Sequence, residues 1–360
     1  MNRIIPACVL FALSVFVGGC DSNGDDPTPT PTPTPSKKTT IGYAAPTLAD
    51  EGQVAIRSGA ESGAKKHGWE FTTTDAGRDA AKQIDQIDSL LARGVTAIVM
   101  VPVDSAALTQ AVEKANEHKV PVISIDRTTS GGQLLLTVQS DNYMAGQQAG
   151  ERMVKLLTDK HGSPKGVVLE LQGSLGTNVA QLRGSGFNDV MKKHDQIKVI
   201  SKPTDWDPDK GAKVTADALT ANPELDGIYW HSDAIGAGVV PELERLERMA
   251  PVGDPKHILL VGIDGMSFML DHIRAGKVDA TMSQNLPDLG DVALDLLADH
   301  LKGKAVPTSG NIEQDGAPWS PAKVEKVNTG PMINLSTTPV DKTNVDNPHH
   351  WGNRGRKKAE

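Results

Sequence analysis

The stretch VTAIVMVP, from Val95 to Pro102, decides the fold. It is a short, almost continuous apolar run, and it is followed by Asp104-Ser105, which are residue types that cap helices. An apolar run of this length is typical of a parallel strand that is buried on both faces of its sheet. We therefore expect a central strand here, in a sheet that helices cover on both sides.

The same alternation of strand and helix extends in both directions from this run. Towards the N-terminus, apolar residues at 41–45 and 71–74 predict two strands, each followed by apolar residues at helical spacing. Towards the C-terminus, five further runs predict strands: 120–126, 166–173, 197–203, 226–232 and 258–265. We predict an α/β protein with two doubly wound, Rossmann-like lobes of parallel sheet, joined by a multi-strand hinge, with the ligand in the cleft between them.

The N-terminal residues have a different composition from the rest of the chain. A lone arginine and the apolar run 4–17 come before Cys20, which predicts a secretory signal peptide over residues 1–19. The quartet Val17–Cys20 resembles the bacterial lipobox, and this resemblance implies cleavage before Cys20 and lipidation of that cysteine. The alternative is an ordinary signal peptide that happens to contain a cysteine.

Residues 20–38 are predicted to form a tether behind the lipid. Proline occupies every second position from Pro27 to Pro35, and proline fixes φ and lacks a backbone donor, so neither helix nor sheet can form there. A polyproline II segment rises by about 3.1 Å per residue, so it would hold the fold on the order of 50 Å from the lipid. Asp21 resembles the retention signal of the inner membrane, so we expect the protein at the periplasmic or extracytoplasmic face of the cytoplasmic membrane.

The composition argues against several classes of protein. Aspartate and glutamate number 45 against 37 lysines and arginines, a formal net charge of −8, so we expect no nucleic-acid partner. Of the two cysteines, Cys8 would leave with the signal peptide, so we expect no intramolecular disulfide.

The sequence carries no recognisable motif for catalysis. There is no P-loop, no nucleophile elbow and no HExxH helix. The stretch DWDPDKG, from Asp205 to Gly211, begins like a calcium loop, but Lys210 and Ala216 stand where that loop needs glycine and glutamate. Paired carboxylates leave a glycosidase as an alternative. We predict a protein that is not an enzyme and that uses neither a cofactor nor a metal.

Polar side chains gather where the predicted strands end. These residues are Asp50, Asp126, Arg127, Asn178, Arg183, Trp206, Ser232, Asp233, Asp264 and Gln284. Carboxylates accept hydrogen bonds, arginine donates through a planar fork, and amides do both, while an indole can stack on the C–H face of a sugar ring. The set predicts a site for a neutral, polyhydroxylated ligand.

Each of these residues also has a purely structural interpretation. Asp233 and Asp264 could cap the helices that follow them. Asp126 and Arg127 could form an ion pair at the rim of the sheet. Trp206 could belong to the core, although its acidic neighbours favour an exposed loop.

Seven stretches resemble, in order and spacing, the periplasmic sugar-binding receptors of the ribose-binding type, whose cores are similar to those of lac-repressor-type regulators. The stretches are RGVTAIVMVPVDSAAL, VPVISIDR, VQSDNYMAGQQAG, LELQGSLGTNVAQLRGSGF, DWDPDKG, VGIDG and ATMSQNLPDLG. The resemblance runs from about Thr40 to Val306 and implies the type I periplasmic binding protein fold. By position it implies ligand contacts at Asp126, Arg127, Arg183, Trp206, Asp264 and Gln284, and at Asn178 as in some members.

The chain departs from the ribose receptors after its first strand. In PTLADEGQV, Asp50 stands at the family's asparagine, and Gly52-Gln53 replace the aromatic pair that sandwiches the sugar. We therefore predict Asp50 and Gln53 as further ligand contacts. Ser232 replaces an amide after the IYWH strand. Stacking from the first lobe is lost and an acceptor is gained, so an aldose, a furanose or a polyol fits as well as ribose. Trp319 supplies either another aromatic wall or core packing.

The resemblance also implies domain boundaries. The predicted segments are 39–140 plus 285–312 for the N-terminal lobe, 141–284 plus 313–335 for the C-terminal lobe, and 336–360 for a C-terminal tail. The main chain would cross between the lobes near Ser140-Asp141, near Gln284-Asn285 and after Gly310.

From the resemblance we expect a lipid-anchored, monomeric receptor that captures a monosaccharide or polyol and delivers it to an ABC permease. Because the chain has no nucleotide-binding motif, the ATPase must be a separate protein. The alternative is a sugar-sensing receptor whose closed form is read by a membrane sensor kinase or chemoreceptor.

Overall fold

The computed structural model describes residues 38–354. The predicted signal peptide, Cys20 and nearly all of the predicted tether lie outside the described residues. Within 38–354, no helix is both long enough and apolar enough to cross a membrane.

The first sheet has eight strands in the order β11-β12-β13-β5-β4-β3-β1-β2. Their bounds are β1 Thr40–Ala45, β2 Glu70–Asp75, β3 Ala97–Met100, β4 Val122–Ile125, β5 Leu136–Ser140, β11 Gly310–Ile312, β12 Ala322–Val327 and β13 Gly330–Leu335. The strands from β13 to β2 pair in parallel, and only β12 and β11 add antiparallel pairs. Strand β3 lies in the interior of the sheet with all four residues buried, so the prediction made from VTAIVMVP is confirmed.

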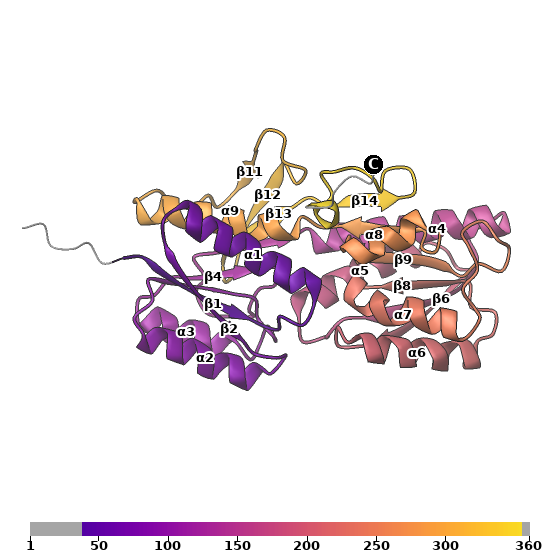
Figure 1. Cartoon of the computed structure of the whole chain (residues 1–360), viewed down its shortest axis with the longest axis horizontal. Helices are drawn as coiled ribbons and strands as arrows, with labels where there is room; N and C mark the ends of the chain where they lie inside the picture. Colours follow the sequence, from indigo (N-terminus) through magenta and orange to yellow (C-terminus); the bar gives the residue numbers. More distant parts are fainter. Residues whose placement is uncertain (1–37, 355–360) are drawn as a thin grey trace, which may run out of the picture. The chain divides into compact units, whose positions relative to one another are not determined.

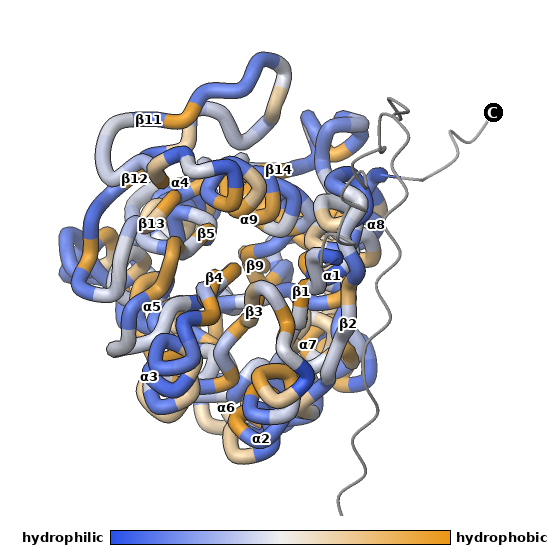
Figure 2. Tube along the Cα trace, turned by 90° about the vertical axis from the view of Figure 1, so that its left-hand side faces the viewer, coloured by the Kyte–Doolittle hydropathy of each residue, from blue (hydrophilic) through white to orange (hydrophobic). Residues whose placement is uncertain are grey.

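Helices cover both faces of the first sheet. They are α1 Glu51–Lys66 and α9 Leu286–Leu301 on one face, and α2 Ala80–Ala92 and α3 Thr109–Glu117 on the other (Figure 1). Ile41 and Tyr43 of β1 belong to the apolar cluster beneath α1 and α9, whereas Ala44 belongs to the cluster beneath α2 and α3. Figure 2 shows the apolar strands enclosed between helices whose outer sides are hydrophilic. Burial on both faces explains why the strands read as continuous apolar runs.

Asp104, expected to cap a helix, caps a turn instead. Its carboxylate accepts hydrogen bonds from the backbone of Ala106 at 2.9 Å and of Ala107 at 2.8 Å. Helix α3 begins only after this turn, at Thr109.

The second sheet has six strands in the order β14-β10-β9-β8-β6-β7. Their bounds are β6 Gly166–Gln172, β7 Ile197–Pro203, β8 Gly227–Trp230, β9 Leu259–Asp264, β10 Ala280–Ser283 and β14 Thr338–Asp341. Its helices are α4 Asn142–His161 and α5 Asn178–Met191 on one face, and α6 Pro208–Ala221, α7 Asp233–Arg245 and α8 Ser267–Arg274 on the other. Only β14 runs antiparallel to its neighbour. The fold class is therefore as predicted.

The expected division of the C-terminal part was wrong in two respects. Residues 313–335 were expected in the second lobe, but β12 and β13 belong to the first sheet, because β13 pairs in parallel with β5. The third crossing between the lobes consequently lies between Leu335 and Thr338 rather than just after Gly310. The predicted tail contributes β14 to the second sheet and a short 3-10 helix, η1, at Trp351–Asn353.

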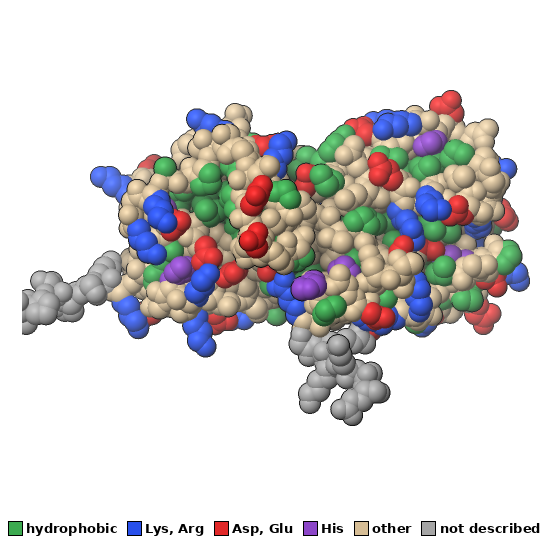
Figure 3. Space-filling view, turned by 90° about the horizontal axis from the view of Figure 1, so that it is seen from above, with side chains coloured by type: hydrophobic (Ala, Val, Ile, Leu, Met, Phe, Trp, Pro, Cys, Tyr) green, Lys and Arg blue, Asp and Glu red, His purple; other side chains and the backbone are tan. Residues whose placement is uncertain are grey.

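Charged side chains are mixed over the surface seen in Figure 3. Basic and acidic groups alternate across both lobes there, without a patch of one sign. The surplus of acidic residues in the sequence is thus spread out on this face.

Candidate ligand-binding site

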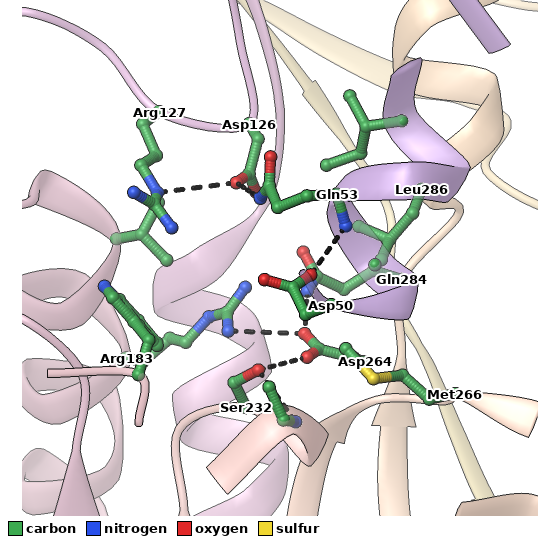
Figure 4. Close-up of a pocket in the computed structure, with 15 residues that line it drawn as sticks. Asp50, Gln53, Asp126, Arg127, Arg183, Ser232, Asp264, Met266, Gln284 and Leu286 are labelled. Carbon is green, nitrogen blue, oxygen red and sulfur yellow. Dashed lines mark hydrogen bonds and ion pairs between the residues drawn. The ribbon is translucent and has the colours of Figure 1, made fainter. Parts of the chain in front are cut away.

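A cavity lies between the carboxyl ends of the two sheets. Nine of the ten residues predicted to bind the ligand line it: Asp50, Gln53, Asp126, Arg127, Arg183, Trp206, Ser232, Asp264 and Gln284 (Figure 4). Parallel strands place the loops that follow them at one edge of a sheet, and two such edges face each other here. The tenth, Asn178, is missing from the lining, and so is Asp233, which was also expected among the polar residues at the strand ends.

Asp264 stands at the end of β9 and is the acceptor on which the second lobe's donors converge. Its carboxylate receives hydrogen bonds from the Ser232 hydroxyl at 2.6 Å, from the backbone N–H of Asp233 at 3.1 Å and from the Gln284 amide. The Arg183 guanidinium lies at 3.4 Å. Burial raises the pKa of Asp264 to about 6, although the charge of Arg183 and the hydrogen bonds act in the opposite direction.

Arg183 is held in place by neutral groups as well as by that carboxylate. It projects from α5 and is almost fully buried. Its Nε donates to Asn142 Oδ1 at 2.9 Å, and its Nη1 donates to the backbone carbonyl of His231. The planar fork thus satisfies three acceptors in fixed directions, which a point charge cannot do. Asn142 carries no ligand-binding signal in the sequence, and only the tertiary contact reveals its role.

The first lobe supplies a second polar group around Asp126. Gln53 Nε2 donates to Asp126 Oδ2 at 3.1 Å, and Arg127 Nε lies 3.6 Å from the same oxygen. Arg127 Nη1 also donates to the carbonyl of Pro102 at 3.1 Å. The Asp126–Arg127 ion pair is therefore real, but it lines the cavity instead of lying at an exposed rim.

Asp50 and Ser232 cap helices and line the cavity at the same time. Asp50 Oδ1 accepts from the backbone N–H of Gln53 at 2.8 Å and begins α1. The Ser232 hydroxyl accepts from the backbone N–H of Ala234 at 3.2 Å and begins α7, while it donates to Asp264. Burial raises the pKa of Asp50 above its usual range. Capping and ligand binding are not exclusive at these positions.

Asp233, by contrast, is purely structural. It is fully buried, does not line the cavity, and accepts from the backbone N–H groups of Gly265 at 2.8 Å and Met266 at 3.1 Å. Trp230 Nε1 donates to it at 3.0 Å. Burial and the nearby Asp264 raise its pKa to about 8.

Trp206 forms a wall of the cavity, and it also belongs to the buried apolar cluster of the second lobe, which was the alternative interpretation. Its residue is only 9% exposed, and a Cβ at Gly173 would lie just 2.1 Å from the indole, so the ring packs directly on that backbone. The guanidinium carbons of Arg127 and Arg183 lie 5.4 and 5.8 Å from the ring centroid. The acidic neighbour Asp205 does face the solvent, where it pairs with Lys210.

Asn178 contacts the other lobe in place of the cavity. From the first turn of α5, its Oδ1 accepts from the backbone N–H of Thr128 at 3.0 Å, and its Nδ2 donates to Gln139 Oε1 at 3.0 Å. Ser105 Oγ accepts from the backbone N–H of Asn178 at 3.2 Å. The side chain therefore joins the lobes beside the cavity.

Sequence reasoning missed the apolar part of the lining. These residues are Ile56, Val179, Ala234, Met266 and Leu286, together with Gly52. Met266 and Leu286 each lie two residues after a predicted ligand contact, and this proximity was the available signal. Among residues 38–354, no cluster of three or more His, Cys, Asp or Glu side chains is placed to hold a metal ion.

Four buried polar atoms of the lining have no hydrogen-bond partner. Two are acceptors, Gln53 Oε1 and Gln284 Oε1, and two are donors, Arg127 Nε and Trp206 Nε1. A buried polar group without a partner costs about 1–3 kcal/mol. A ligand that offers both hydroxyl donors and acceptors would remove this cost.

Comparisons with known proteins agree with this geometry. A family model described as periplasmic binding protein domain matches residues 41–305. The ribose import binding protein of Bacillus subtilis (strain 168) is 33% identical over 300 residues, which cover 83% of this chain and 93% of that protein. The xylitol-binding protein of Mycolicibacterium smegmatis is 31% identical over 231 residues, covering 64% of this chain and 63% of that protein. The crystal structure of a galactofuranose binding protein has the same fold, with a TM-score of 0.73 at 23% identity, covering 85% of this chain and 96% of that chain.

Proposed function

The chain belongs to the periplasmic binding protein family, and we propose that it is the solute-binding receptor of an ABC importer, with a monosaccharide or polyol as its ligand. Relatives named for ribose, xylitol and D-allose support a ligand of this class. The receptor delivers its ligand to a permease whose ATPase is a separate protein.

The observation that carries this proposal is the set of unpaired polar atoms in the cavity. Four residues that line the cavity each carry a buried atom without a hydrogen-bond partner: an acceptor on Gln53 and on Gln284, and a donor on Arg127 and on Trp206. A hydroxyl both donates and accepts, so vicinal hydroxyls can satisfy donors and acceptors together. A carboxylate ligand would offer acceptors only, and an ammonium ligand donors only.

The cavity favours a sugar held mainly by hydrogen bonds on the first-lobe side. Asp50 and Gln53 stand where the ribose receptors have an asparagine and an aromatic pair, so that side supplies acceptors and an amide. Trp206 is the aromatic side chain of the lining, and it comes from the second lobe. An aldose, a furanose and a polyol all meet these requirements.

We further propose that Cys20 carries a lipid and that residues 20–38 tether the receptor to the extracytoplasmic face of the membrane. The lipobox-like quartet Val17–Cys20 and the proline–threonine alternation support this proposal. A receptor held near the membrane stays close to its permease.

A thermal-shift screen of monosaccharides and polyols tests the proposed function. A ligand that binds only the folded protein raises its melting temperature with increasing concentration. We expect at least one sugar or polyol to do so, and amino acids, tested as control ligands, to have no effect. A panel in which only amino acids stabilise the protein would overturn the proposal.

A further inference from the structure

The C-terminal strap, residues 342–354, packs behind the cavity. It follows β14, ends in η1 beside α8, and appears in yellow in Figure 1. Trp351 in this strap is 5% exposed and shares a buried apolar cluster with Met266 and Leu286, which both line the cavity. The family model matches only residues 41–305, so the strap lies beyond the part of the chain that the family accounts for.

Trp351 makes a direct contact with the backbone of Asp264. The indole Nε1 donates to the carbonyl oxygen of Asp264 at 2.7 Å. That oxygen also accepts from the backbone N–H of Gln284 at 3.0 Å. The carbonyl oxygen therefore uses both of its lone pairs: one accepts from the backbone N–H of Gln284 and the other from Trp351 of the strap.

This backbone needs support because Asp264 has an unfavourable conformation. Its φ is +131°, a region that L-residues other than glycine rarely adopt. Such a conformation is costly and persists only when its surroundings determine it. Gly352 packs against the next residue, since a Cβ there would lie 2.4 Å from the carbonyl oxygen of Gly265.

The strap itself is well anchored to both lobes. Arg274 of α8 pairs with Asp346 at 2.6 Å and donates to the carbonyl of Val345 at 3.1 Å. Arg354 forms two hydrogen bonds with the carboxylate of Asp288 on α9, at 2.9 and 2.8 Å. The indole is thus presented to Asp264 by a fixed scaffold rather than by a loose chain end.

We infer that Trp351 is a positioning residue for ligand binding: its indole N–H holds the backbone of Asp264 in the conformation that directs the carboxylate towards Arg183, Ser232 and Gln284. The inference rests on the proposed function for its effect on affinity. A ligand would then bind tightly only while the strap is docked.

The test compares Trp351→Phe with Trp319→Phe. Phenylalanine keeps most of the apolar contact at position 351 but removes the N–H donor. Like Trp351, Trp319 is buried, at 2% exposure, belongs to the same apolar cluster and does not line the cavity, whereas the hydrogen bond to Asp264 comes from Trp351, so Trp319 serves as a matched control. Calorimetry uses D-ribose, xylitol, D-allose and myo-inositol as probes. We expect Trp351→Phe to weaken binding of whichever probe binds by about 3- to 10-fold, the effect of one hydrogen bond, and Trp319→Phe to leave it unchanged.

Hydrogen exchange supplies a second measurement that needs no ligand. In Trp351→Phe, backbone amides of residues 264–266 and Gln284 should exchange faster than in the wild-type protein, while those of β3 should not change. Unchanged exchange at Asp264, or a lower melting temperature with unchanged affinity, would show that Trp351 is merely a packing residue and would overturn the inference. If the wild-type protein binds none of the four probes, the proposed function is in question, and exchange alone decides the role of Trp351.

Discussion

Asp264 combines three roles in one residue. Its carboxylate accepts hydrogen bonds from Ser232 and Gln284 and pairs with Arg183. Its carbonyl oxygen accepts a hydrogen bond from Trp351 of the strap, and its backbone has a strained, positive φ. In a buried site such donors are worth more than in water, because the low dielectric strengthens each contact. The arrangement is therefore sensitive both to the geometry of its donors and to the charge of the carboxylate.

Arg183→Lys should weaken sugar binding roughly ten- to a hundredfold although the net charge is unchanged. Lysine cannot donate to Asn142, to the His231 carbonyl and to Asp264 in the fixed directions of the fork. One lost hydrogen bond to a charged group is worth about 1.5–3 kcal/mol, and this free energy corresponds to a roughly ten- to hundredfold increase in Kd. Calorimetry measures the change. Arg245→Lys on α7, an exposed pair with Glu242, is the matched control and should bind like the wild type.

The stability contributed by Asp264 should depend on pH in a defined direction. Its folded-state pKa is raised from 3.8 to about 6, so between pH 4 and 6 the folded state holds a proton that the unfolded chain has released. Its contribution therefore favours folding below about pH 4 and is lost as the pH rises through about 6. Two pKa units correspond to about 3 kcal/mol at most.

Asp264→Asn removes this titration. In the absence of ligand, the free energy of unfolding of the variant relative to the wild type should increase from pH 4 to pH 7, as measured by urea unfolding. Asn222→Ala, which removes no titratable group, serves as the control, and its difference from the wild type should not change with pH. A difference for Asp264→Asn that falls with pH would contradict the raised pKa.

At the scale of elements, helix α5 contributes to the cavity and also contacts the first lobe. Arg183 points from α5 into the cavity, while Asn178 at its first turn binds Thr128 and Gln139 of the first lobe. The lobes are joined by three crossing segments, near Ser140, near Gln284 and between Leu335 and Thr338. Crossing segments of this kind absorb the backbone changes of hinge closure. Helix α5 therefore carries both a cavity residue and a contact between the two lobes.

Asn178→Ala should speed ligand release without changing which sugar is preferred. The side chain joins the two lobes but lies outside the cavity lining, so we expect its loss to act on lobe closure and not on ligand contact. Two neutral hydrogen bonds are removed, at about 0.5–1.5 kcal/mol each, so we expect dissociation to be roughly 5- to 100-fold faster. Stopped-flow measurements follow the release.

The control for this experiment is Asn222→Ala. Asn222 caps the end of α6, and its side chain bonds to Ala218 within the same helix. Its loss should lower stability slightly and leave the dissociation rate unchanged. A changed order of preference among sugars in Asn178→Ala would place this side chain in the ligand contact after all.

At the scale of the whole molecule, the proposed export and membrane attachment depend on N-terminal residues that lie outside residues 38–354.

Cys20→Ala should release the protein from the membrane into the soluble fraction. Lipid attachment needs the cysteine thiol, and a tether of alternating proline and threonine offers no apolar anchor of its own. Membrane fractionation followed by immunodetection measures the result. Thr28→Ala in the tether is the control and should stay in the membrane fraction; equal retention of Cys20→Ala would remove the lipoprotein proposal.

Local chemistry was sufficient to predict most of the fold and of the cavity from the sequence. Strands such as VTAIVMVP are recognisable because both of their faces are buried. The loops after parallel strands must meet at one edge, so the sequence could place Ser232, Asp264 and Gln284 together at the edge of the second sheet.

What only the tertiary structure decided depends on contacts between residues far apart in the chain. Strand β13 joins the first lobe because it pairs with β5, nearly two hundred positions earlier in the sequence. Asn178 turns to the opposite lobe, and Trp351 reaches Asp264, 87 positions away. Apolar periodicity describes which face of an element is buried, but it carries no information on which distant partner buries it. That choice follows from the packing of the whole chain.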